Sequence, residues 1–382
     1  MNQPLLTFQS LNALRFFAFF SVFLLHIPGF EGSQFLGKIV LAGNVSGVDF
    51  FFTLSGFLIS YLLCYEKIAT GKINGRNYFL RRSLRIWPLY FLGVGIAFLN
   101  NFISQKFHLG NPDGYSPNPL YSLTFLENYQ MIIHDNFPNG APLRVFWSLC
   151  VEEHFYLLWF LIFSVTSTKQ LPKIFGFLWL TGITYRMWFH AYFPENSIDD
   201  YDLLSKMDFF CAGGLSGWMV ATRFEKVKSY FKQILFYQRT IIAVLMVFLF
   251  YSNLLFPGLP FKYLYIPSIS ALLYACIILM TITTSWLIFE EVSPFSQLGK
   301  ISYAMYVYHT VVIVALGALL KYSGLMVEGW FTKVTFAIIA LGISIIVSYF
   351  SYRYFEKPFL RFKTRFRIKE REPNQAMRTG VK

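Results

Sequence analysis

The residues best suited to chemistry in this sequence are ionisable side chains set within long apolar runs. In the first run, LRFFAFFSVFLLH, Arg15 and His26 stand eleven residues apart. Eleven residues make almost three helical turns, so both side chains project from one face, about 16 Å apart along it. Such groups are costly inside a membrane and are usually retained for a partner or a task. The spacing predicts a polar cleft; the alternative is a structural arginine and a histidine bonded to backbone carbonyls.

The second apolar run, GVDFFFTLSGFLIS, carries Asp49 near its outer end. If the two helices are antiparallel, Asp49 lies at a depth similar to that of His26. A carboxylate there could orient and charge-stabilise the imidazole, as a base and its orienting group do in acyl transfer. Ser55 lacks the G-x-S-x-G context of a serine nucleophile. We therefore expect Asp49 to support His26, and Ser55 and Gly56 to serve close helix packing.

Three arginines crowd the segment RRSLRIWPLY that precedes the third run. Arg81, Arg82 and Arg85 have the spacing of neighbours on one helical face, and their guanidinium forks suit phosphate oxygens. Positive charge that only marks the cytoplasmic side explains them equally well. The segment is therefore predicted to be either a phosphate-binding site or a topology signal.

Further polar groups enter the apolar runs at two places. WSLCVEEHFYLLW brings Glu152 and Glu153 into a membrane segment, so at least one of these carboxylates is expected to face a cavity. Adjacent helical positions point about 100° apart, which argues against a metal site, and none is predicted. ISYAMYVYH adds Tyr306 and His309, which are candidates to line the cavity or to stabilise an oxyanion.

Membrane-spanning helices must position these residues. Of 382 residues, 55% are hydrophobic and only 14% charged, a balance that a water-soluble surface does not tolerate. The apolar residues fall into runs of roughly 18 to 25, the length that crosses a hydrocarbon core. The predicted fold is an all-α integral membrane bundle of about ten transmembrane helices. The spans are placed at 11–30, 47–65, 86–103, 145–166, 174–191, 204–222, 240–256, 266–289, 301–320 and 330–355.

The distribution of Lys and Arg predicts the orientation of these spans. With the N-terminus inside, 23 of the 33 basic residues fall on the cytoplasmic side and seven on the other. The positive-inside rule then places both termini in the cytoplasm. Basic loops beside anionic headgroups explain the net charge of +13, so nucleic acid is not an expected partner. The four cysteines have no spacing typical of a disulfide framework or a zinc site.

The chain is predicted to form a single transmembrane domain over 1–360, followed by a basic cytoplasmic tail over 361–382. One long outer loop, 104–144, interrupts the pattern of spans. It contains PLYSLTFLENYQMI, which is too polar to cross a membrane. A surface or re-entrant helix there could cap a cavity, and an ordered loop without chemistry is the alternative.

Six motifs together resemble the acyltransferase-3 family of membrane O-acyltransferases. They occur in the family's order from about residue 8 to 360: the R-x10-H pattern, GVDFFFTLSGFLI, RRSLRIWP, WSLCVEEHFY, ISYAMYVYH and YFEKP. His154 departs from the pattern, because glutamine is commoner there. The resemblance implies transfer of an acyl group from cytoplasmic acyl-coenzyme A to a hydroxyl of a carbohydrate or related acceptor, often across the bacterial inner membrane.

By this resemblance His26 is the expected catalytic residue and Arg15 its required partner, with Arg81 and Arg85 near the donor's nucleotide. It implies acetyl-coenzyme A as donor substrate, no permanently bound cofactor, and a cell-surface or lipid-linked polysaccharide as acceptor. Some members carry an esterase-like domain after the last span, whereas this sequence ends about 25 residues beyond YFEKP. We expect the membrane domain to perform the transfer itself or with a separate partner.

Two sets of alternatives remain at this point. The competing class is a transporter or exporter with a proton-coupled polar seam and no acyl chemistry. No inverted repeat is visible, and the arginine cluster favours the acyl-coenzyme A donor. Within the acyltransferase interpretation, His26 either removes a proton from the acceptor hydroxyl or is itself transiently acylated. The acceptor, the acyl chain and the oligomeric state are left open.

Overall fold

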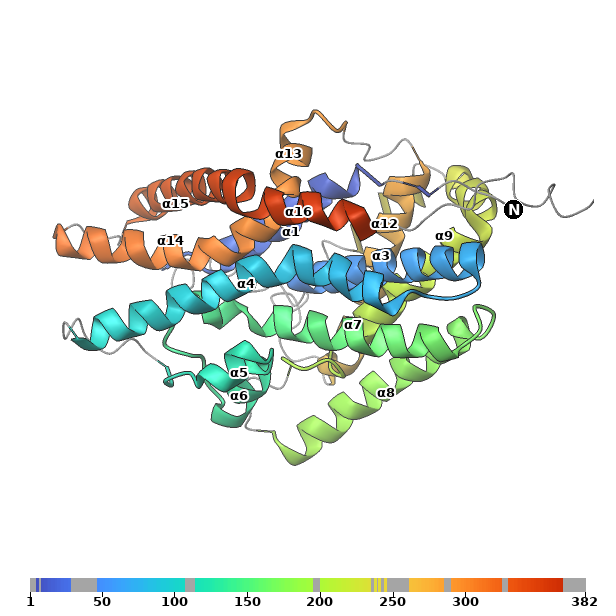
Figure 1. The fold of residues 1–382 in the computed structure, drawn as a ribbon, viewed down its shortest axis with the longest axis horizontal. Helices are drawn as coiled ribbons and strands as arrows, with labels where there is room; N and C mark the ends of the chain where they lie inside the picture. Colours follow the sequence, from blue (N-terminus) through green and yellow to red (C-terminus); the bar gives the residue numbers. More distant parts are fainter. Residues whose placement is uncertain are drawn as a thin grey trace, which may run out of the picture.

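Long α-helices make up the described part of the protein, with no named β-strand in it, and several run lengthwise through the molecule (Figure 1). The computed structural model describes residues 5–6, 8–28, 47–106, 114–194, 200–234, 237–238, 240–241, 244–245, 261–284, 290–324 and 329–366. The long helices are α1 (Leu11–Leu25), α3 (Gly47–Thr70), α4 (Gly75–Lys106), α7 (Trp147–Val165), α8 (Leu171–Tyr192), α9 (Met207–Gln233), α12 (Lys262–Thr283), α14 (Ser302–Tyr322) and α15 (Trp330–Ser351).

Six helices of the described part are long and apolar enough to cross a membrane. These are Gly47–Thr70, Gly75–Phe102, Trp147–Val165, Lys262–Thr283, Ser302–Tyr322 and the continuous stretch Trp330–Phe366. The predicted helical membrane fold is confirmed to that extent. Helices α8 and α9 coincide in position with the predicted spans 174–191 and 204–222. The predicted span 240–256 lies largely outside the described residues, and the count of about ten and the terminal orientation stay predictions.

Helix α1 is shorter than the predicted span 11–30, because it ends at Leu25 with His26 as its C-cap. Pro28 follows two residues later. Proline has no N–H to donate and disfavours helical backbone at the residue before it, so the helix cannot continue. His26 therefore lies at the end of a helix rather than within one.

Helix α4 begins eleven residues before the predicted span 86–103, at Gly75, and it continues through Pro88. The arginine segment that begins at Arg81 is consequently helical. Pro88 removes one intrahelical hydrogen bond, which a long helix packed against neighbours can tolerate. Of the three arginines predicted to share one face of this helix, Arg82 and Arg85 do so, whereas Arg81 has other contacts.

The predicted outer loop contains short helices: α5 (Pro119–Leu123), α6 (Glu127–His134) and the 3-10 turn η1 (Ala141–Val145). In Figure 1 α5 and α6 lie below α4 and α7. Glu127 is fully buried and accepts hydrogen bonds from the Tyr115 hydroxyl, at 2.6 Å, and from Ser122. Burial raises the pKa of this carboxyl. These buried hydrogen bonds to Glu127 therefore hold the segment from Tyr115 to Glu127 in place.

Glycines bring α3 and α9 into close contact. A Cβ added to Gly213 would lie 1.9 Å from the Thr53 carbonyl oxygen, and one on Gly56 would lie 2.4 Å from that of Phe210. Small residues allow such backbone approach between membrane helices. The predicted packing role of Gly56 is confirmed.

The two ends of the bundle differ in character. At one end Lys67 Nζ donates to the carbonyls of Phe163 and Thr166, each at 2.6 Å, and Arg81 Nη1 donates to that of Phe366 at 2.9 Å. We call this the basic end and define it by residues 66–85 and 357–366. The opposite end, which we call the loop end, holds α5, α6 and residues 200–206.

Replacing Gly213 with Ala is expected to destabilise the protein by about 1–3 kcal/mol, because the new methyl group meets backbone atoms that cannot move aside. Thermal unfolding in detergent measures the effect. Gly176→Ala is the matched control, since a Cβ added at that position would meet no atom within 4 Å. Equal melting temperatures for the two variants would refute close packing at Gly213.

Candidate active site

A cavity of about 100 Å³ lies within the bundle among α1, α3, α4, α7 and α14. Its lining follows α3 from Val48 to Ile59, a rise of about 16 Å at 1.5 Å per residue. Phe51, Phe52 and Leu58 form part of an apolar wall. The polar residues in the lining are Arg15, Ser55, Arg82, Arg85, Ser148, Glu152, Tyr156, Ser302, Tyr303 and Tyr306.

Positive charge dominates this cavity. Among the described residues of its lining, Arg15, Arg82 and Arg85 face a single carboxylate, that of Glu152. Arg15 donates to Asn12 Oδ1 at 2.6 Å, and the buried Nε of Arg82 has no hydrogen-bond partner in the described part of the chain. Guanidinium groups that outnumber the nearby carboxylates suit an anionic ligand.

Arg81 has a different environment from its two neighbours. Its Nη2 forms an ion pair with Glu66 at 3.0 Å, and its Nη1 bonds to a backbone carbonyl. Arg82 and Arg85 line the cavity with Arg15. Successive helical residues point about 100° apart, which explains why Arg81 and Arg82 separate.

The adjacent residues Glu152 and Glu153 also have different environments. Glu152 lines the cavity and accepts hydrogen bonds from Ser55 Oγ at 2.9 Å and from the Tyr156 hydroxyl at 2.8 Å. Glu153 is not part of the described lining. The expectation that at least one carboxylate faces a cavity is confirmed. Ser55, predicted to serve packing, instead holds Glu152 in place.

His26 lies against His309, with ring centroids 5.0 Å apart. His26 Nδ1 is 2.8 Å from the Val22 carbonyl oxygen and 3.4 Å from His309 Nε2. His309 Nδ1 is 2.7 Å from the Tyr306 carbonyl oxygen. A carbonyl oxygen only accepts, so we assign the proton to Nδ1 in both rings. His309 Nε2 then accepts from His26, and Nε2 is the basic nitrogen of His26.

Tyr306 connects the histidine pair with the cavity. It lines the cavity one helical turn before His309. Its hydroxyl donates to the Val145 carbonyl at 2.9 Å and lies 2.6 Å from Ser148 Oγ. The structure therefore brings the predicted residues Tyr306 and His309 to the cavity and to His26, respectively.

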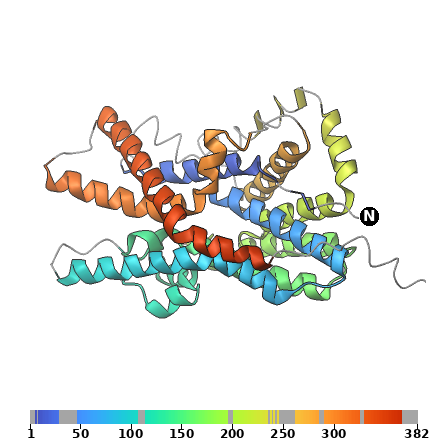
Figure 2. The same cartoon turned by 45° about the horizontal axis from the view of Figure 1, so that its top comes forward.

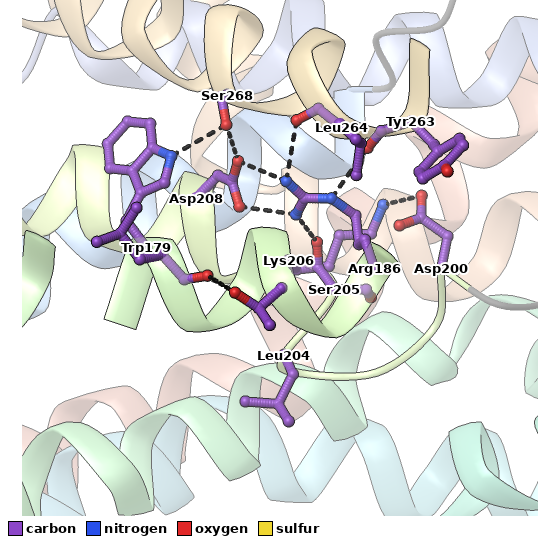
Figure 3. A network of polar contacts seen from close by, with 12 residues as sticks. Trp179, Arg186, Asp200, Leu204, Ser205, Lys206, Asp208, Tyr263, Leu264 and Ser268 are labelled. Atoms are coloured by element: carbon purple, nitrogen blue, oxygen red, sulfur yellow. Dashed lines mark hydrogen bonds and ion pairs between the residues drawn. The ribbon is translucent and has the colours of Figure 1, made fainter. Parts of the chain in front are cut away.

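Asp49 forms an ion pair with Lys206, at 3.2 Å. Lys206 also pairs with Asp200 at the loop end, as Figure 3 shows. Gly47, two residues earlier, packs against Ala18. The predicted support of His26 by Asp49 stays a prediction. Lys206 was missed by sequence reasoning, although a lysine at the start of the predicted span 204–222, among several aspartates, was a visible signal.

Arg186 shows that a buried charge within a helix can be structural. It donates to Asp208 Oδ1 and Oδ2, at 2.7 and 2.8 Å, and to the carbonyls of Ser205 and Tyr263 (Figure 3). Asp208 also accepts from Ser268. This network ties α8, α9 and α12 together. A cavity of about 210 Å³ borders it at the loop end.

No group of three or more His, Cys, Asp or Glu side chains that could hold a metal ion occurs among the residues that the structure describes.

Asp208→Ala is expected to destabilise the protein by about 3–5 kcal/mol, because it leaves the buried Arg186 guanidinium without its carboxylate partner. Thermal unfolding in detergent provides the measurement. Lys300→Ala is the control, since the partly exposed Lys300–Glu291 pair contributes about 0–1 kcal/mol. A similar small effect of both substitutions would contradict the structural role of the Arg186 network.

Comparisons with known proteins find relatives of part of this chain. "Putative peptidoglycan O-acetyltransferase YrhL" of Bacillus subtilis is 30% identical over 173 residues, which cover 43% of this chain and 25% of that protein. "Peptidoglycan O-acetyltransferase OatA" of Listeria monocytogenes is 27% identical over 166 residues, covering 39% of this chain and 26% of that protein. The matched part thus spans about a quarter of the length of these curated relatives. No solved structure matches.

A sequence profile described as "Acyltransferase domain" matches residues 8–353, which is nearly the whole chain. The match contains the cavity residues from Arg15 to Tyr306 and the histidine pair. Together with its apolar helices, it identifies a multi-pass membrane protein with an acyltransferase domain. The chain belongs to the acyltransferase-3 family.

Proposed function

We propose that the protein transfers an acetyl group from acetyl-coenzyme A to a hydroxyl of a carbohydrate, a cell-surface or lipid-linked polysaccharide, in a bacterial plasma membrane. The observation that carries this proposal is the cation-rich cavity. It leads from Arg82 and Arg85 past Arg15 to Tyr306, whose neighbour His309 contacts His26. The two relatives named above are called peptidoglycan O-acetyltransferases, so peptidoglycan is one acceptor of the proposed class.

The donor's phosphates bind at the basic end in this proposal. Coenzyme A carries several phosphate charges, and Arg82 and Arg85 offer planar forks that match phosphate oxygens. The basic end faces the cytoplasm, as the Lys and Arg distribution predicts, where acyl-coenzyme A is available. The pantetheine arm passes Arg15 and presents the thioester toward the loop end. Arg81, held by Glu66, contributes charge from beside the site.

In direct transfer, His26 Nε2 removes the proton from the acceptor hydroxyl while the oxygen attacks the thioester carbonyl. The tetrahedral intermediate collapses, the C–S bond breaks, and the coenzyme A thiolate takes the proton from the imidazolium. In the other route Nε2 attacks first and expels the coenzyme A thiolate, giving an acyl-imidazolium. The acceptor oxygen then takes the acyl group and its proton passes to the thiolate, which returns His26 as a neutral imidazole. Both routes require the tautomer that the Val22 carbonyl and His309 select.

Two features support the positive charge that His26 acquires. His309 Nε2 accepts a hydrogen bond from His26 Nδ1–H. This bond strengthens when the His26 ring becomes positively charged. Asp49, Lys206 and Asp200 carry two negative charges and one positive charge at the loop end. In this proposal their net negative charge favours the His26 imidazolium through long-range attraction, which a low-dielectric interior screens weakly. In this proposal His309 orients His26, and Asp49 adds charge support.

Loss of the central residues tests the proposed reaction. Protein in nanodiscs is mixed with labelled acetyl-coenzyme A and a cell-envelope glycan fraction, and label in the glycan is measured. His26→Ala is expected to lower transfer by about 10²–10⁴-fold, as removal of a general acid–base group does. Arg15→Ala is expected to abolish transfer as well.

His134→Ala is the matched control, because His134 is exposed on α6 and does not line the cavity. It should retain wild-type transfer. If wild-type protein neither binds nor consumes any acyl-coenzyme A, the acyltransferase proposal fails and a carrier without acyl chemistry replaces it.

His309 can be tested separately as a positioning residue. His309→Ala removes one of the two acceptors of His26 Nδ1–H and leaves the Val22 carbonyl as the other. We expect kcat to fall about 10–100-fold, a loss typical of groups that orient a functional histidine. KM for acetyl-coenzyme A should stay unchanged, since His309 does not line the cavity. His309→Gln offers an amide oxygen in its place and should recover part of kcat. A rise in KM without a fall in kcat would contradict the positioning role.

A further inference from the structure

The last described helix lies over the basic end of α4. Helix α15 continues through the π-helical turn η2 (Tyr352–Glu356) into α16 (Lys357–Lys363), followed by the turn η3 (Thr364–Phe366). Figures 1 and 2 both show α16 alongside α4. The hydrogen bond from Arg81 to the Phe366 carbonyl fastens this segment at its end. A segment distant in sequence therefore covers the arginine cluster.

Lys363 is the lysine of α16 that turns toward this cluster. It is partly buried, whereas Lys357 and Arg361 on the same helix are exposed. The positive charges that act on its ammonium group belong to Arg85, Arg82, Arg81 and Arg15. Three of these four arginines line the cavity. Lys363 is thus a further basic side chain at the cavity's basic end.

Local acids do not balance this concentration of positive charge. Glu66 is engaged by Arg81, and Glu152 is held by Ser55 and Tyr156. Glu356 is buried and acts on Arg85. Glu153 interacts in the same way with Arg82. These four carboxylates face five basic side chains: Arg15, Arg81, Arg82, Arg85 and Lys363.

In the described part of the chain, no acidic residue forms an ion pair with Lys363. Partly buried like charges repel one another strongly and lose hydration. The folded protein can hold them together at least cost when an anion lies between them. The arrangement therefore resembles a binding site whose counter-charge comes from a ligand.

We propose that Lys363 binds a phosphate group of the donor, so that α16 and the arginines of α4 enclose the donor's nucleotide from two sides. This inference rests on the proposed acetyl-coenzyme A reaction. A lysine ammonium on a flexible stem acts as a point charge toward phosphate, which complements the planar forks of Arg82 and Arg85. The donor site then combines the last residue of α16 with the arginines of α4.

The test compares acetyl-coenzyme A binding by wild type, Lys363→Met and Lys363→Arg in nanodiscs of zwitterionic lipid. Lys363→Met is expected to weaken binding about tenfold, the loss of one charge-assisted hydrogen bond. Lys363→Arg should restore most of the affinity. kcat at saturating donor should stay at the wild-type value in both variants, because Lys363 is remote from His26 along the bundle.

Lys357→Met is the matched control: it removes the same charge from an exposed position of the same helix and should bind as wild type does. Melting temperatures check that α16 remains folded. If wild type binds acetyl-coenzyme A and Lys363→Met binds it equally well, this inference is wrong while the proposed function stands. If wild type does not bind acetyl-coenzyme A, the proposed function fails as well.

A lipid headgroup offers the same phosphate chemistry. A parallel experiment therefore measures retention of phosphatidylglycerol by the wild type and by Lys363→Met. Loss of lipid retention, with acetyl-coenzyme A affinity unchanged, would overturn the assignment of Lys363 to the donor. A change in donor affinity alone supports it.

Discussion

Ionisable side chains inside a helical bundle must find their counter-charges within the protein, since hydrocarbon supplies neither water nor ions. The Arg186 network meets this requirement fully, because Asp208 and nearby carbonyls engage its guanidinium. Lys206 meets it with two aspartates. The cavity does not meet it, because one glutamate faces three arginines. Charged side chains with counter-charges in the protein hold helices together, whereas those without them suit a charged ligand. The two kinds cannot be told apart in the sequence.

Most helix positions could be predicted from the sequence, because runs of apolar residues are long and bounded by polar segments. The predicted helix boundaries were wrong where hydropathy does not mark the end of a helix. Helix α4 starts at Gly75 because its first turns are polar yet packed, as the Tyr78 hydroxyl bonded to the Tyr156 carbonyl illustrates. Helix α1 stops short of residue 30 because Pro28 overrides a sequence that is still apolar. Hydropathy measures burial in lipid or protein alike and does not detect backbone restrictions.

The candidate site was predictable as far as a single helix determines it. The spacing of Arg15 and His26 depends only on helical periodicity. The partner of His26 depends on how helices pack, and His309 stands 283 residues away in the sequence. The expectation for Asp49 assumed that two antiparallel helices begin at one level. Gly47 instead packs against Ala18, eight residues before His26 and about 12 Å from it along α1.

The length of the cavity separates donor recognition from group transfer. Arg82 and Arg85 lie at the basic end, whereas His26 lies beyond the opposite end of α1 from Arg15. The helices that line the cavity, with an apolar wall that includes Phe51, Phe52 and Leu58, enclose the passage between the two ends. A thioester that reaches His26 through it is shielded from bulk water on the donor side. The acceptor must then approach from the loop end. The arginines select the donor at one end of the cavity, and transfer takes place at the other. This separation also limits hydrolysis of the thioester before an acceptor binds.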